Sequence, residues 1–148
     1  MSNTSAQIIA GLETTVETAV SGIAKLRFVN EIERNDFRSK DNRYGVKSLG
    51  AESVVGQVRT LTIDHDYEIA LVQGYVNVSP NDYNQLSTVD TLHDRMDDIA
   101  KAIQNTKIGL SSIVRLATLN TISEPEYLTD EKVVIIRAIF TIKYSSNL

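Results

Sequence analysis

Two long stretches of the chain, residues 58–78 and 133–145, alternate between apolar and polar residues with the two-residue period of a β-strand. The first reads as one long strand or a pair of strands, and the second as a single strand. Residues of one parity share a face, and that face carries Leu61, Ile63, His65, Tyr67, Ile69 and Leu71 in the first stretch and Val134, Ile136, Ala138, Phe140, Ile142 and Tyr144 in the second. A sheet built from these strands needs a layer that covers its apolar face.

Two other segments repeat apolar residues at helical spacing and can supply that layer. The first follows the capping candidates Thr4 and Ser5 and has Gly22 as its stop; its stripe is Ile8, Ile9, Leu12, Val16, Ala19, Val20 and Ile23. The second begins at Ser79–Asp82, where a cap is followed by a proline, or alternatively at Ser87. Its stripe is Leu86, Val89, Leu92, Met96, Ile99, Ala100 and Ile103.

The remaining segments complete the predicted order of elements. Lys25–Arg34 and Leu110–Ile122 are rich in β-forming residues and are predicted to be strands, whereas 123–131 reads as a loop. Glycine, serine and charged residues interrupt Asn35–Gly56, which predicts a long loop or extended arm. Short connections favour antiparallel pairing. We therefore expect a single α+β domain over 1–148, with one mostly antiparallel β-sheet of four to five strands covered by two amphipathic helices.

The composition excludes several classes of protein. Fifteen Lys and Arg against nineteen Asp and Glu give a net charge of −4, which argues against a protein that mainly grips nucleic-acid phosphates. The chain has no cysteine, so disulfides and thiol chemistry are excluded. The start of the chain lacks a basic flank, and no apolar run approaches the ~20 residues of a membrane span. These features predict a soluble cytoplasmic protein.

The clearest candidate for a chemical site is His65, which stands between Asp64 and Asp66. In a strand these two carboxylates point away from the imidazole, so the three groups cannot share a metal or a proton; a turn inserted at 64–67 would change this. His93 has Asp94 and Asp97 nearby at a spacing that could hold a cation, although a solvated helix face explains the pattern equally well. We predict no catalytic, metal or cofactor site.

Charge is unevenly distributed along the chain. The segment around Tyr44 is a basic island within an acidic sequence, and it carries Arg34, Arg38, Lys40, Arg43 and Lys47. It is either a solvated loop, an arm that reaches an acidic surface of a neighbouring subunit or partner, or a weak nucleic-acid contact. The acids Asp64, Asp66 and Glu68 form a row on one strand face. That row is either an ordinary wet face or the lining of a passage that repels a polyanion.

In the order of its predicted elements and in the residue patterns of several segments, the chain resembles the tail terminator proteins of long-tailed bacteriophages. The segments that carry the resemblance are "VRTLTIDHDYEIALVQGYV", "LHDRMDDIAKAIQNT", "GLSSIVRLATLNTI" and the terminal "VVIIRAIFTIKYSSN". The resemblance implies a structural role without enzymatic activity. Such proteins assemble as a ring, generally of six subunits, on the end of the tail tube, where they stop tube polymerisation and provide a docking surface for the head or neck.

The same resemblance implies the partners. These are further copies of the chain in a hexameric ring, the tail tube protein, head–tail connector or neck proteins, and genomic DNA that passes through the channel without specific binding. No membrane and no cofactor are implied, and the expected location is the virion tail or neck, after assembly in the host cytoplasm. Asp64, Asp66 and Glu68 are then candidates for the channel lining. The alternatives are a neck or head-completion adaptor or a tail tube protein of the same virion, a small enzyme, and a binding module that uses the basic island.

Overall fold

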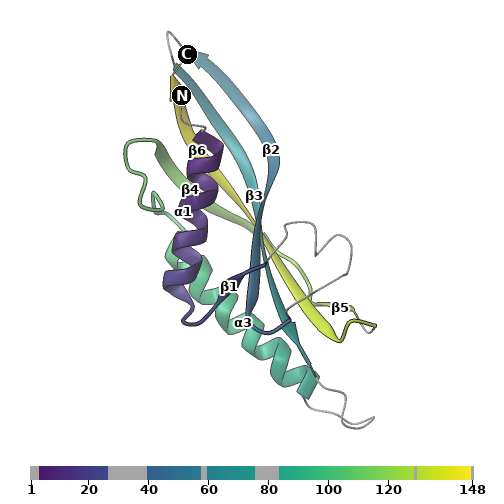
Figure 1. Cartoon of the computed structure of the whole chain (residues 1–148). Coiled ribbons are helices and arrows are strands. Elements are labelled where there is room, and N and C mark those ends of the chain that lie inside the picture. Colours follow the sequence, from purple (N-terminus) through teal and green to yellow (C-terminus); the bar gives the residue numbers. More distant parts are fainter. Residues whose placement is uncertain (1–3, 27–39, 58–59, 76–83, 129, 148) are drawn as a thin grey trace.

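The computed structural model describes residues 4–26, 40–57, 60–75, 84–128 and 130–147. Two helices pack on the same face of one long, twisted sheet (Figure 1). The elements in chain order are α1 (Thr4–Ala19), β1 (Ala24–Lys25), β2 (Arg43–Gln57), β3 (Thr60–Gly74), α3 (Asn84–Ile103), β4 (Val114–Ile122), β5 (Glu126–Leu128) and β6 (Val133–Asn147).

The sheet has six strands in the order β1-β2-β3-β6-β4, and β5 pairs with β6 beyond the end of β4. Every pairing is antiparallel except the short parallel contact of β1 with β2. The expected α+β class with a mostly antiparallel sheet is therefore confirmed, and the number of strands is six rather than four to five.

The core lies between the helices and the sheet face that the alternation predicts. Ile8, Leu12 and Val16 of α1 are fully buried against this face, as are Leu92, Met96 and Ile99 of α3. The sheet contributes Tyr44, Val46, Tyr67, Ile69, Leu71, Val134, Ile136, Ala138, Phe140 and Ile142. A smaller apolar cluster of Leu26, Ala70, Val72, Val133 and Ile135 lies on the opposite face, next to partly buried Leu128.

The prediction of a loop over Asn35–Gly56 is wrong from Arg43 onward, because β2 occupies Arg43–Gln57. Its glycines and polar residues belong to an irregular strand, in which the register shifts between Ser48 and Gly50 and again between Ala51 and Ser53. Gly50 has φ +107, a conformation that side-chain-bearing residues rarely adopt, so a residue that suggested a loop here forms a bulge. Residues 35–39 lie outside the described part of the chain.

The other differences concern element boundaries. Thr4 and Ser5 lie inside α1 rather than before it, and Gly22 follows the helix with φ +78. The predicted strand Lys25–Arg34 is represented by β1 at its start, and its remainder from residue 27 lies outside the described residues, as does the predicted helix start at Ser79–Asp82. The predicted loop 123–131 contains the short strand β5.

The long strands extend past the N-terminal end of α1 toward the top of Figure 1. Residues 67–72 of β3 are buried on both faces, whereas residues 61–66 are partly exposed on both faces. The change occurs at Tyr67, whose hydroxyl hydrogen-bonds Ser5 Oγ in the first turn of α1 at 2.9 Å. The sheet is therefore a double-sided core at one end and a projecting end, in which β2 and β6 flank β3, at the other.

Candidate functional site

His65 lies on the helix side of β3, apart from its two acidic neighbours. Its Nε2 is 2.6 Å from Ser48 Oγ, its Nδ1 is 3.4 Å from the Tyr144 hydroxyl, and its ring stacks on Tyr67 with centroids 4.4 Å apart. Asp64 and Asp66 contact groups of β6 on the other face. The prediction that the three side chains do not converge is confirmed.

Burial lowers the pKa of His65, and nearby Asp66 opposes this change. As the pH falls, the His65 imidazole is therefore protonated at a higher pH in the unfolded chain than in the folded chain. The His65 contribution to stability is present above about pH 6.5 and declines as the pH falls toward the lower folded-state pKa.

Between about pH 7.5 and about pH 5.5, the wild type should lose more free energy of unfolding than His65→Gln, with a difference in slope below about 1.4 kcal/mol per pH unit. Urea unfolding measures this.

His93→Gln is the matched control for the pH experiment. His93 is exposed on α3, so this substitution removes one imidazole without changing the sheet. We expect this variant to follow the wild-type profile. Equal slopes for the wild type and His65→Gln would contradict the prediction.

The acid row Asp64, Asp66 and Glu68 lies on the face away from the helices, and each carboxylate contacts β6. Asp64 Oδ1 is 3.9 Å from Lys143 Nζ, Asp66 Oδ1 accepts a hydrogen bond from Thr141 Oγ1 at 2.7 Å, and Glu68 pairs with an arginine. Two of the three acids thus have a cation beside them, which reduces the negative potential of the row. Their role as a channel lining stays a prediction.

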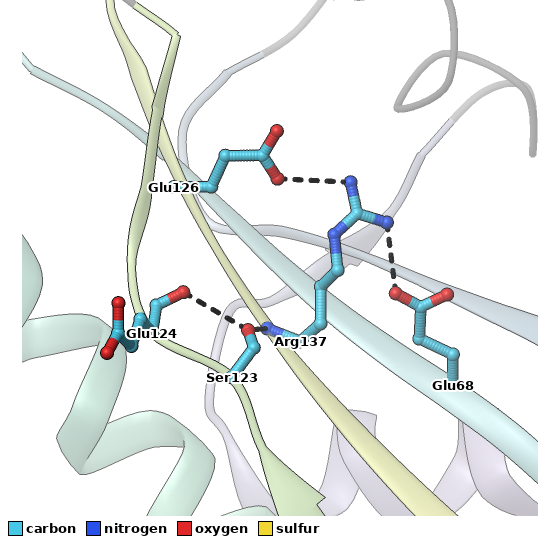
Figure 2. A network of polar contacts seen from close by, with 5 residues as sticks. All are labelled: Glu68, Ser123, Glu124, Glu126 and Arg137. Atoms are coloured by element: carbon cyan, nitrogen blue, oxygen red, sulfur yellow. Dashed lines mark hydrogen bonds and ion pairs between the residues drawn. The ribbon is translucent and has the colours of Figure 1, made fainter.

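A polar cluster on this face centres on Arg137 of β6 (Figure 2). Its Nη1 donates to Glu68 Oε1 at 2.9 Å, and its Nη2 lies 3.4 Å from Glu126 Oε2 on β5. The Arg137 backbone N–H also donates to Ser123 Oγ at 3.0 Å. Arg137 therefore ties the segment between β4 and β5 to the centre of the sheet.

Glu68 is the one charged side chain that is buried among the described residues, with 9% of its surface exposed. Burial by itself would lower the pKa of Arg137, but the hydrogen bond and charge of Glu68, together with Glu126, raise it. Such a pair is stable when both partners are present and costly when one is removed.

The basic island is divided by the structure. Arg34 and Arg38 lie outside the described residues, while Lys40 Nζ donates to the Glu131 carbonyl at 2.6 Å. Arg43 and Lys47 lie on β2.

Tyr44 cannot serve as a surface contact, because its ring is fully buried under α1 and its hydroxyl donates to Glu17 Oε1 at 2.7 Å. Burial, with the Glu17 carboxylate, raises the pKa of the Tyr44 hydroxyl far above its usual value. The residue types around Tyr44 predicted a loop, but Tyr44 lies in β2 with its side chain on the inward face, which corrects that prediction.

The exposed large apolar side chains of the described residues lie at the two lateral edges of the sheet. On one side, β2 carries Leu49, the extra residue at its first register shift, beyond the short stretch where β1 pairs with Arg43 and Tyr44. The other edge carries Leu116 and Ile122 of β4 and Tyr127 of β5. Exposed apolar residues gathered at sheet edges are typical of surfaces that bind another chain.

Part of the β4 edge is already occupied. Backbone groups of Ala117 bond to Asn105 and Thr106, and the Leu119 N–H donates to Gln104 Oε1 at 2.5 Å. The register of β4 on β6 also shifts twice. A partner at this edge would therefore contact side chains and β5 rather than a continuous row of free backbone groups.

An open groove of about 390 Å³ lies between the C-terminal halves of α1 and α3 and residues 106–109. The hydroxyls of its threonines donate to backbone carbonyls: Thr14 to Ala10, Thr15 to Gly11, Thr18 to Thr14 and Thr106 to Ile103. The described residues contain no group of three His, Cys, Asp or Glu placed to hold a metal. No helix in the described part of the chain is long and apolar enough to cross a membrane.

Comparison with known proteins rests on structure, since no family model and no curated protein sequence matches the chain. Among solved structures, the chain is similar to one from the virion of a native gene transfer agent (GTA) particle, with a TM-score of 0.62 and 8% identity. The two chains share one fold. The match covers 94% of this chain and 95% of the other, so it extends over the whole architecture rather than a common substructure.

Proposed function

We propose that this protein is a structural component of a tailed phage-like virion, and specifically a tail terminator that forms a ring on the end of the tail tube. The whole-length similarity to a chain of a GTA virion supports the coarser part of this proposal. The order of elements that resembles the tail terminator family supports the finer part. The role is structural, without turnover of a substrate.

The observation that supports a ring is the placement of two different surfaces on opposite sides of one sheet. A cyclic assembly needs heterologous contacts, in which one patch of each copy meets a different patch of the next. The β2 edge with Leu49 and the β4–β5 edge with Ile122 and Tyr127 have this arrangement. Copies joined in this way leave no lateral surface unused once the ring closes, and closure limits growth in the plane of the ring.

The remaining surfaces of the ring would then face the tail tube on one side and the connector or neck on the other. A hexamer is the expected copy number, and assembly takes place in the host cytoplasm before the particle is complete. Genomic DNA passes through the central channel without specific binding, in agreement with an open sheet face on which acids and bases are paired.

Gene inactivation in the virus that encodes this chain tests the terminator role. Electron micrographs should show tails several times longer than normal, and a plasmid copy of the wild-type gene should restore their length. Tails of normal length beside unattached heads would instead indicate a neck or head-completion adaptor. Absence of tails would indicate a tube protein, and normal infectious particles would contradict a virion role.

A further inference from the structure

A band of alternating charge crosses the face of the sheet that the helices leave open. Lys47 of β2 is paired in register with Glu68 of β3, Glu68 bonds Arg137 of β6, and Arg137 reaches Glu126 of β5. Read from one edge to the other, the signs are positive, negative, positive and negative. Opposite charges on neighbouring strands stabilise a sheet, so the inner members of the band support the fold itself.

The outer members of the band lie at opposite edges and face solvent. Lys47 is exposed on β2, and the side chain of Glu126 is 50% exposed on β5. Glu126 meets Arg137 at 3.4 Å through one carboxylate oxygen, and a carboxylate can accept several further hydrogen bonds. The ammonium group of Lys47 has three donors. Both ends of the band thus have capacity for a partner beyond the chain.

Each end also has an exposed apolar neighbour. Leu49 lies two positions after Lys47. Tyr127 directly follows Glu126 but lies on the helix side of β5, the side that Ile122 shares through its pairing with Ala138. Each edge therefore presents one charge of its own sign on the open face and, close by along the edge, an exposed apolar side chain.

We infer that the partner of the β4–β5 edge is the β2 edge of a second copy, with Lys47 opposite Glu126 and Leu49 against Tyr127 and Ile122. This inference rests on the proposed ring and names its lateral contact. Pairing of unlike edges continues the alternation of charge from copy to copy. A two-fold dimer of like edges would instead place Lys47 against Lys47 or Glu126 against Glu126, which is unfavourable.

Charge reversal followed by mixing tests the contact. Lys47→Glu gives a chain with acid at both ends of the band, and Glu126→Lys gives a chain with base at both ends. Each variant alone should assemble at least about tenfold more weakly than the wild type, because like charges then meet at every contact. An equal mixture should form rings in which the two variants alternate, since every contact in such a ring joins opposite charges.

The mixture separates contacts between copies from effects within a chain, because each variant keeps the same internal neighbours alone and in the mixture. Native mass spectrometry of purified full-length chains, alone and with tail tubes, reports composition and copy number. A mixture of Lys47→Glu with Asp97→Lys is the matched control, since Asp97 is exposed on α3 away from the band. Asp97→Lys should form rings of its own, and no rings should appear in which it alternates with Lys47→Glu.

Cysteine cross-linking provides a second measurement that tolerates poor folding of one reversal variant. The chain has no cysteine, so Lys47→Cys mixed with Glu126→Cys should give a mixed dimer with a short bismaleimide, whereas Lys101→Cys mixed with Glu126→Cys should not. If the wild type forms rings but the mixed variants form neither rings nor the cross-linked dimer, the proposed contact is overturned and the ring itself is not. A wild-type chain that remains monomeric even on tubes would overturn the ring as well.

Discussion

Replacement of Arg137 by methionine is expected to lower the free energy of unfolding by about 2–3 kcal/mol, less than the full cost of breaking a deeply buried pair because the arginine is partly exposed. The substitution retains most of the apolar stem and removes the guanidinium that Glu68 contacts at 2.9 Å. Glu68 is then left with 9% of its surface exposed to water and without its cation. The second tie, from Arg137 to Glu126, is lost at the same time.

A double-mutant cycle measures how much of this loss belongs to the pair. Glu68→Leu combined with Arg137→Met removes both charges, and the double variant should regain about 1–2 kcal/mol relative to the sum of the single changes. Glu126→Gln is the matched control on the exposed side and should change stability by about 0.5 kcal/mol or less. Urea denaturation provides all four values. Strict additivity of the two central substitutions would show that Glu68 does not depend on Arg137.

Replacement of Gly11 by valine is expected to cost about 2 kcal/mol, because it overfills a closed contact between α1 and the segment before β4. A Cβ at Gly11 would lie 3.0 Å from Leu110 Cδ1 and 3.3 Å from the Ile108 carbonyl oxygen. Leu110 can rotate, but the backbone of Ile108 is held at φ 45 beside Gly109 at φ 73. The γ-methyl groups of valine therefore crowd the Ile108 backbone even where Leu110 moves aside.

Ala10→Val is the matched control for this prediction. Ala10 is exposed on the same turn of α1, so the same bulk costs only its helix propensity, about 0.5 kcal/mol. Thermal and urea unfolding of both variants compare the two sites. Equal losses at Ala10 and Gly11 would show that α1 does not pack against residues 108–110 as closely as the structure indicates.

The alternation of apolar residues was sufficient to predict most of the fold. Strands β3 and β6 and the apolar stripes of α1 and α3 follow from local periodicity, because one strong core face determines both the element and its orientation. Strand β2 was missed because its two register shifts break the alternation and its glycines imitate loop chemistry. Strand β5 was missed because a three-residue strand has no period to detect.

The contact between Glu68 and Arg137 could not be predicted from local sequence patterns. Glu68 belongs to the acid row of its strand, and Arg137 has the parity opposite to the apolar face of the last strand, so both outward orientations were predictable. Their contact joins residues 69 positions apart, and it depends on the pairing of β3 with β6, which no local pattern determines. The separation of His65 from Asp64 and Asp66 was predictable because it depends only on the parity of one strand.

The position of β6 has a consequence for synthesis on the ribosome. This strand follows every other described strand in the chain, yet it lies in the interior of the sheet between β3 and β4 and also holds β5. Until translation reaches it, β4 and β5 have no strand to pair with, while the β2–β3 hairpin can already form. A nascent polypeptide can thus present only one of its two lateral edges, so docking between copies is postponed until each molecule has been translated through β6.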